Sequence, residues 1–598
     1  MTDHSMFHKR IRFLVAITFS LLSILILRLV DVQAVNASSI SARATNELLN
    51  TSVLLAPRGI ITDAHGVQLA RSVAAFTIVI DQTMIVDPEK AAELTSPVLG
   101  MTVAELIPLY TGSKRYQIIQ KNAAPAVWRQ LQTTLTDYNT AVMKEKGGLA
   151  KRVVGFFSER SYVREYPTGK LASSLIGFIN DAGVGAAGIE SSMNKKLSGV
   201  NGVYEYANGA GTIIPGSANV RVAAQSGTGV QLTIDRDIQW VAQDAISQAV
   251  KSANAKSGTV IVMDPKTGQI LAQASAPTFD PANRKTITLD SIRNPAVQDV
   301  YEPGSTGKVI TIAAGLDEKV TTPLTVYTIP GTYKAGGRVF HDAERHGTEH
   351  LTTAGILARS SNIGVIQIGA KMENQKFYEY LQKFGIGSNT GSGLPGESAG
   401  ILHPVDTWSN SSAPTIAFGQ GYSVTALQAT SVMATIANGG VRVTPTVVAG
   451  TIDPSGHYSP SKNQTTTRVV SSETAANVRT MLESVVSEQG TAPAAAIPGY
   501  RVAGKTGTAQ RVDSSCGCYR GYTSSFIGYA PADAPRYVVS VVIQNPQGQH
   551  FGGVIAGPVF KKVMSFVLQS QHVAPTGGKP TPLALTEAEL KKSVSVKN

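Results

Sequence analysis

A serine and a lysine at S-x-x-K spacing are the first residues of this chain that could do chemistry. Ser305 and Lys308 follow a turn-forming Glu-Pro-Gly sequence at residues 302–304 and precede an apolar run at 309–314. The turn and the run, which has no polar face, predict a buried helix whose first amides are free. Lys308 would lie on the same helical face as Ser305. A lysine kept partly neutral by burial or by a neighbouring cation could accept the serine proton, so Ser305 is a candidate nucleophile.

Two more short motifs follow along the chain. An S-x-N motif runs from Ser360 to Asn362, and a K-T-G motif begins at Lys505, after the strand-like residues 500–503. Each motif is weak alone, because serine and asparagine often do no more than cap a helix. The order S-x-x-K, S-x-N, K-T-G is that of penicillin-recognising serine enzymes. A second K-T-G, at 266–268, precedes the candidate nucleophile, and its flanks predict a hairpin turn.

Over nearly its whole length the chain resembles a class B penicillin-binding protein, which is a monofunctional D,D-transpeptidase of peptidoglycan synthesis. The resemblance rests on the three motifs, on residues 293–305 and 418–425, and on segments like the pedestal motifs of that family at 58–63, 164–169 and 185–190. The flanks of the S-x-N motif are most similar to the division-specific, septal branch. A side-wall (elongation) transpeptidase and a non-catalytic β-lactam-binding sensor or scaffold remain alternatives. A β-lactamase or carboxypeptidase is disfavoured, because no glutamate is placed to activate water.

The resemblance implies a role for each residue of the first two motifs. Ser305 would attack the penultimate D-Ala carbonyl of a stem peptide, and Lys308 would accept the serine proton. Ser360 would relay a proton toward the leaving D-Ala nitrogen. Asn362 would hydrogen-bond the substrate amide and hold Lys308.

The resemblance also assigns the residues of the K-T-G strand. Lys505 would place a second cation near the lysine of the first motif and lower the pKa of that lysine. Together with Thr506 and Thr508, it would attract the terminal carboxylate of the substrate. Gly507 would let the donor peptide lie against the strand without a clash. The backbone amides of Ser305 and Thr508 would form the oxyanion hole.

The expected fold class is α+β. The resemblance implies a penicillin-binding-protein transpeptidase domain, with an antiparallel five-stranded sheet packed with helices, on an elongated N-terminal pedestal domain and one N-terminal transmembrane helix. The sequence pattern predicts a helix at 236–251, a hairpin at 258–274, and strands at 501–510, 524–530 and 537–543. The expected parts are a cytoplasmic tail (1–12), a transmembrane anchor (13–33), a pedestal, or dimerisation-type, domain (34–226), a transpeptidase domain (227–573) and a flexible tail (574–598).

The N-terminal segment predicts a membrane anchor. Residues 13–27 are mostly apolar and follow a basic stretch at 8–12, so the N-terminus is expected in the cytoplasm and the catalytic domain outside the cell. Residues 35–37 also resemble a signal-peptidase site, which makes a cleaved signal the alternative. The resemblance to anchored class B proteins favours an uncleaved single-pass anchor.

Composition limits the possible partners. The formal net charge is +12 over 598 residues, without a basic stripe interleaved with aromatic residues, so nucleic acid is not expected. An anionic cell wall or lipid headgroups are the expected neighbours. The predicted ligands are peptidoglycan stem peptides, as D-Ala-D-Ala donor and amine acceptor, and β-lactam antibiotics. Nothing in the chain resembles a glycosyltransferase, so the resemblance implies a polytopic membrane glycan polymerase and divisome proteins as partners.

Two groups of potential metal ligands are not expected to bind metal. Residues 341–350 contain histidines and acidic residues but lack the H-E-x-x-H order, and they predict a solvated loop. Cys516 and Cys518 are too few for a closed zinc site and are expected to be an incidental loop pair, with a disulfide as the alternative. No metal or cofactor is expected.

Overall fold

The computed structural model describes residues 4–39, 49–209, 212–213, 219–283, 285, 287–462, 464–513, 515–577 and 582–595. The chain forms two compact units. The first unit holds Met1–Pro57, Ala74–Val163 and Gly199–Ser226, and the second holds Arg58–Val73, Arg164–Ser198 and Gly227–Asn598. The division falls within the strands β3 (Gln68–Ile80) and β5 (Phe156–Glu165).

The first unit contains the predicted anchor and a small folded part. Within the described residues, Phe7–Val35, which contains most of α1 (His4–Val30), is the one helical stretch long and apolar enough to cross a membrane. The folded part has its own core, in which Ile78 and Leu131 are fully buried. Its other elements are β1 (Leu49–Leu54), α3 (Pro88–Leu99), α4 (Val103–Tyr110), β4 (Gln117–Ala123), α5 (Pro125–Val142), β6 (Gly202–Gly209), β7 (Thr212–Ile213) and β8 (Asn219–Val222).

The second unit is built around an antiparallel sheet of five strands, as expected. Its spatial order is β11 (Ile270–Ala276), β10 (Ser257–Met263), β24 (Tyr537–Gln544), β23 (Cys518–Ala530) and β22 (Ala503–Asp513). The K-T-G strand β22 therefore lies at one edge of the sheet. The other K-T-G forms the turn between β10 and β11, where the side chain of Asp264 accepts a hydrogen bond from the amide of Lys266 (2.8 Å), so the hairpin prediction is confirmed.

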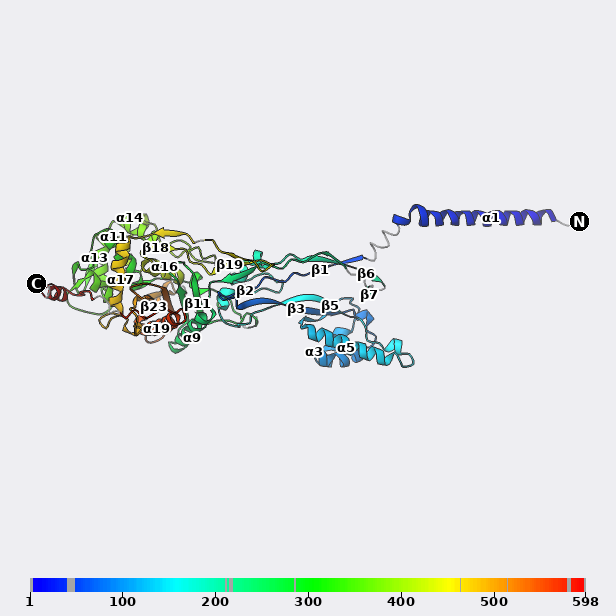
Figure 1. Cartoon of the computed structure of the whole chain (residues 1–598), viewed down its shortest axis with the longest axis horizontal. Helices are drawn as coiled ribbons and strands as arrows, with labels where there is room; N and C mark the ends of the chain where they lie inside the picture. The colour runs from blue at the N-terminus through cyan, green and yellow to red at the C-terminus, as the bar shows by residue number, and fades with distance from the viewer. Residues whose placement is uncertain are drawn as a thin grey trace. The chain divides into compact units, whose positions relative to one another are not determined.

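Helices cover both faces of this sheet, so β10, β11 and β24 are buried along almost their whole length. On one face, α9 (Arg236–Ser252) and α19 (Gly557–Ser570) contact each other and the strands (Figure 1). On that face the Phe526 ring packs against Phe560 of α19, with centroids 4.8 Å apart. The next residue, Ile527, points to the opposite face, where α16 (Ala426–Ala437) packs.

Further helices of the second unit surround the motifs. The predicted buried helix is α11 (Lys308–Asp317), and every residue from Lys308 to Leu316 is buried. The remaining helices and strands are β2 (Ile61–Thr62), α6 (Ser173–Ile176), α7 (Gly188–Ser192), α8 (Asn194–Leu197), β9 (Gly229–Leu232), α10 (Pro295–Gln298), β12 (Val300–Tyr301), β13 (Val326–Ile329), β14 (Tyr333–Ala335), β15 (Arg338–Phe340), β16 (Glu349–Thr352), α12 (Thr353–Ala358), α13 (Asn362–Gly369), α14 (Asn374–Lys383), α15 (Ser412–Ala417), β17 (Val424–Thr425), β18 (Val441–Val443), β19 (Val448–Ile452), β20 (Tyr458–Pro460), β21 (Thr466–Arg468), α17 (Ser472–Val486), α18 (Gly552–Ile555) and α20 (Glu587–Ser595).

Part of the expected flexible tail is held against the second unit. Leu585 is buried, and its carbonyl accepts a hydrogen bond from the amide of Thr352 (3.0 Å). The Thr352 hydroxyl donates to the carbonyl of Ala584 (2.7 Å), and α20 follows. Residues 578–581 and 596–598 of the expected tail lie outside the described residues.

The three pedestal-like segments meet at one buried cluster of charges in the second unit. Glu190 is fully buried, and its two carboxylate oxygens lie 2.6 Å from Nε of Arg58 and 2.6 Å from Nε of Arg164. Arg58 also donates to Oδ1 of Asn194 (2.8 Å) and to the carbonyl of Glu190 (2.7 Å). Each segment thus contributes one charge to a buried network, in which every charge has a partner.

Candidate active site

Ser305 lies in a short 3₁₀ turn, Gly304–Thr306, directly ahead of α11. Gly304 has a φ of 53°, and its amide donates to the carbonyl of Gly419 (2.8 Å), which fixes the turn to a neighbouring loop. The turn's own bonds, from the amides of Thr306 (3.3 Å) and Gly307 (2.8 Å), do not use the Ser305 amide. Among the described residues the Ser305 hydroxyl has no hydrogen-bond partner, so both groups are free to meet a ligand.

Ser360 lies in the connection between α12 and α13. Its φ is 61°, in the left-handed region that a serine rarely adopts. Ser361 is the N-cap of α13, because its hydroxyl accepts a hydrogen bond from the amide of Gly364 (3.0 Å). The capping role that serine often has is therefore performed by Ser361, and Ser360 is turned toward the two lysines.

The two motif lysines converge on Ser360. Nζ of Lys308 lies 2.5 Å from the Ser360 carbonyl oxygen and 3.2 Å from its Oγ. Nζ of Lys505 lies 3.0 Å from the same Oγ. Both lysines are 0% exposed. The structure thus brings together one residue from each of the three motifs around a single hydroxyl group.

The burial of these lysines alters their protonation. Burial lowers the pKa of Lys308 to about 7, although the charge of Asp342 acts in the opposite direction. Burial, and next the charge of Lys308, lower the pKa of Lys505 well below its usual value. Burial is thus the first cause for both lysines, and the repulsion between the two cations, which the sequence analysis expected, is a further cause for Lys505. A neutral amine one turn beyond Ser305 is able to accept a proton.

The K-T-G strand packs directly against the turn that holds Ser305. A side chain at Gly507 would come within 2.3 Å of Oγ of Ser525 and 3.1 Å of the Pro303 carbonyl oxygen. Gly507 is therefore needed for packing even before a substrate is present. Thr506 and Thr508 flank Gly507 along the strand. The Thr506 hydroxyl contacts Oγ1 of Thr491 (2.8 Å), and the Thr508 hydroxyl contacts the amide of Gly552 (3.1 Å). Thr508 accepts its bond, so its hydroxyl proton remains available to a carboxylate.

Asn362 is not joined to Lys308 by a hydrogen bond in the described structure. Its side-chain amide donates instead to the carbonyl of His341 (2.9 Å). The loop at 341–350 was expected to be solvated, and this is wrong for Asp342 and His346, whose side chains are only 12% and 16% exposed. Asp342 contacts the start of α13, so sequence reasoning missed a residue beside the site. In the sequence, the D-x-x-x-H spacing of Asp342 and His346 could have indicated that these two residues interact.

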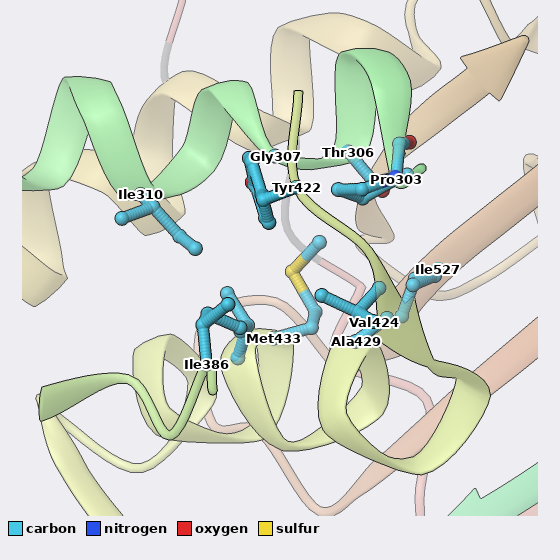
Figure 2. Close-up of a pocket in the computed structure, with 11 residues that line it drawn as sticks. Pro303, Thr306, Gly307, Ile310, Ile386, Tyr422, Val424, Ala429, Met433 and Ile527 are labelled. Atoms are coloured by element: carbon cyan, nitrogen blue, oxygen red, sulfur yellow. The ribbon is translucent and has the colours of Figure 1, made fainter. Parts of the chain in front are cut away.

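A small apolar cavity lies next to the turn that holds Ser305 (Figure 2). It is lined by Gly307, Ile310, Tyr422, Met433 and Ile527, among others. A side chain at Gly307 would come within 2.3 Å of the Tyr422 hydroxyl, which is buried and has no hydrogen-bond partner among the described residues. The turn is therefore supported from behind by close apolar packing.

The two cysteines form a disulfide at the end of the β22–β23 hairpin, where Asp513 of β22 pairs with Cys518 of β23. The expected loop pair is thus a disulfide-bonded one. The pairing also extends β23 to Cys518, well before the predicted start at residue 524.

Comparison with known families matches both halves of the chain. Residues 258–565 match the family described as Penicillin binding protein transpeptidase domain. Residues 53–232 match the Penicillin-binding Protein dimerisation domain. The chain thus contains a transpeptidase domain, and the three motifs all lie within the first of these matches.

Known proteins are similar to the chain over almost its full length. Penicillin-binding protein PbpB of Mycolicibacterium smegmatis is 36% identical, over 95% of this chain and 92% of that protein. Peptidoglycan D,D-transpeptidase FtsI of Buchnera aphidicola is 30% identical, over 94% and 95%. The crystal structure of penicillin-binding protein 3 of Mycobacterium tuberculosis with aztreonam is 32% identical, with a TM-score of 0.69 over 90% of this chain and 100% of that one. The chain belongs to the class B penicillin-binding proteins, with the transpeptidase and dimerisation domains of that family.

Proposed function

We propose that this protein is a serine-type peptidoglycan D,D-transpeptidase, a target of β-lactams, and that it acts in septal cell-wall synthesis. The observation that carries the proposal is the position of Ser360 Oγ, which lies 3.2 Å from Nζ of Lys308 and 3.0 Å from Nζ of Lys505, beside the turn that holds Ser305. The D,D-transpeptidase name of the Buchnera relative and the aztreonam complex of the mycobacterial one support it.

The first half of the proposed reaction forms an acyl-enzyme. Ser305 Oγ attacks the carbonyl carbon of the penultimate D-Ala while neutral Lys308 takes the hydroxyl proton. The amides of Ser305 and Thr508 stabilise the oxyanion, and each such donor typically contributes about 3 to 4 kcal/mol. The C–N bond then breaks, and Ser360 passes its hydroxyl proton to the nitrogen of the departing D-Ala while it takes the proton that Lys308 carries.

The second half transfers the acyl group to an amine. An amine from a neighbouring stem peptide attacks the ester carbonyl, its proton returns through Ser360 and Lys308, and the Ser305 hydroxyl is restored. The terminal carboxylate of the donor is held before this step by the hydroxyls of Thr506 and Thr508. This carboxylate also places a negative charge near Lys505, which favours the protonated form of that lysine.

The N-terminal part is proposed to hold this chemistry at the outer face of a membrane. Residues 13–33 form a single-pass anchor with the cytoplasmic tail at 1–12, and the pedestal (34–226), the transpeptidase domain (227–573) and the tail (574–598) lie outside. The long apolar helix and the basic residues before it support this topology. A polytopic membrane glycan polymerase and divisome proteins are the proposed partners.

The test uses the full chain in detergent with a fluorescent penicillin. We expect one label per chain, located on Ser305 by mass spectrometry, and no label on Ser305→Ala. A stem-peptide substrate supplied with a glycan polymerase should then yield cross-linked product. Labelling without cross-links would contradict the enzymatic role and indicate a sensor.

A tagged copy should localise at mid-cell, and an even distribution along the wall would contradict the septal role.

A further inference from the structure

Asp342 is a carboxylate that binds the S-x-N segment without belonging to any motif. Its Oδ1 accepts hydrogen bonds from the amides of Asn362 (2.5 Å) and Ile363 (2.9 Å), the first two residues of α13. Its Oδ2 accepts one from the Ser361 hydroxyl (2.7 Å). Three consecutive residues that follow Ser360 are thus tied to one carboxylate.

This attachment lies next to the strained residue of the site. Ser360 has a φ of 61°, so its backbone conformation must be maintained by its neighbours. The same backbone orients the carbonyl that accepts the 2.5 Å bond from Nζ of Lys308. If the start of α13 moved, the Ser360 carbonyl and hydroxyl would move relative to Lys308. A displacement of about 1 Å can cost a factor of about 100 in rate.

His346 holds Asp342 from the other side. Its Nε2 lies 3.1 Å from Oδ2 of Asp342, and its Nδ1 contacts the Gly347 carbonyl (2.6 Å). Burial lowers the pKa of His346, but the Gly347 carbonyl and the Asp342 carboxylate raise it by more, so that it lies above its usual value. The other charge facing His346 is that of Glu349, which itself pairs with Arg359 (3.4 Å).

Asp342 also acts on Lys308 electrostatically. Its negative charge favours the protonated form of Lys308, against the effect of burial. Asp342 is therefore a counter-charge that acts on this lysine without touching it through a hydrogen bond. A residue that holds Ser360 and biases Lys308 acts on two parts of the site at once.

We propose that Asp342 and His346 form a charged positioning pair, in which the carboxylate fixes Ser360 and balances Lys308 while His346 fixes the carboxylate. The pair makes and breaks no covalent bond. The inference rests on the proposed transpeptidase function for its effect on rate, and on the geometry alone for its effect on the backbone of α13.

The second unit contains a control pair of the same residue types, in which the histidine is more exposed (67% for His65, against 16% for His346). Oδ1 of Asp235 accepts from the amides of Asp237 (2.9 Å) and Ile238 (3.1 Å) at the start of α9, and its Oδ2 lies 3.2 Å from Nε2 of His65. This pair adjoins β11, the sheet edge opposite the K-T-G strand, since the amide of Asp235 donates to the carbonyl of Leu271. Replacing it removes the same kind of helix cap from a place remote from Ser305.

The first experiment measures acylation of the full chain by a fluorescent penicillin as a function of pH. In Asp342→Asn, we expect the rate to fall by about 10- to 100-fold and its inflection to move below that of the wild type, because Lys308 loses a charge that favours its protonated form. His346→Gln should be slow at acid pH and approach the wild type at alkaline pH, where His346 is itself neutral. Asp235→Asn and His65→Gln should match the wild type.

Equal losses in the Asp342 and Asp235 variants would overturn the proposal, because they would reflect stability alone. An unmoved inflection in Asp342→Asn would overturn it as well.

The second experiment does not depend on acylation. Hydrogen exchange of Asp342→Ala should accelerate in peptides covering residues 360–366 and not in those covering 235–241, and Asp235→Ala should show the reverse. Unchanged exchange at 360–366 would overturn the proposal. If the wild type were not acylated at all, the proposed function would fail, and this exchange pattern would still decide whether Asp342 holds the segment.

Discussion

The second unit contains two buried groups of charges that are managed in opposite ways. At the meeting point of the pedestal-like segments, Glu190 lies 2.6 Å from both Arg58 and Arg164, so each charge has a partner of opposite sign. In the cleft, Lys308 and Lys505 are equally buried, and their hydrogen bonds go to neutral oxygens of Ser360 and Thr506. The first group is held by ion pairs, whereas burial lowers the pKa of both lysines of the second group. A buried charge that forms an ion pair stabilises the fold. A buried amine whose hydrogen bonds go only to neutral oxygens loses its proton more easily and can act as a base.

The largest expected effect comes from removing the amine of Lys308, the proposed base. Lys308→Met replaces a buried amine by an apolar side chain of similar length, and we expect acylation by penicillin to slow by about 100- to 10,000-fold, the usual contribution of a general base. The free energy of unfolding should stay the same or rise, because a poorly compensated buried cation is removed. Labelling rates and denaturant unfolding measure the two effects. A large loss of stability would show that this lysine is structural.

Glu190→Ala should have the opposite effects, lowering the free energy of unfolding without changing the acylation rate. It leaves two buried guanidinium groups without their shared counter-charge, which typically costs about 3 to 5 kcal/mol of unfolding free energy. Acylation per folded molecule should be unchanged. The control is Glu165→Gln, which removes an exposed ion pair with Arg71 (3.0 Å) and should cost less than about 1 kcal/mol. Similar losses in the two variants would mean that burial does not distinguish these pairs.

A smaller expected effect tests whether apolar packing also holds the turn of Ser305 in position. Gly307→Ala places a methyl group 2.3 Å from the Tyr422 hydroxyl, and such overpacking costs about 1 to 3 kcal/mol and should slow acylation by displacing Ser305. Tyr422→Phe removes this hydroxyl, which has no partner among the described residues, and should be nearly neutral alone. The double variant should recover part of the rate. Additive losses would contradict the steric explanation.

These two groups of charges also show which features could be predicted from the sequence and which could not. The three motifs, the buried helix after Ser305 and the five-stranded sheet were predicted, because each depends on local pattern or family resemblance. The contact between Arg58 and Glu190 could not be, since it joins residues 132 positions apart and depends on the whole topology. Asp342 was missed for the same reason: a carboxylate can cap a helix from any loop that returns to it.

The pH dependence of Ser305 acylation tests the central claim most directly. Lys308 has its pKa lowered to about 7, so the neutral amine that accepts the proton is lost as the pH falls below that value. The rate of labelling by a fluorescent penicillin should therefore fall about tenfold per unit below an inflection near 7, and level off above it. A rate that keeps rising toward pH 10, the range of an ordinary lysine, or that does not depend on pH, would contradict the claim that the buried Lys308 is the base.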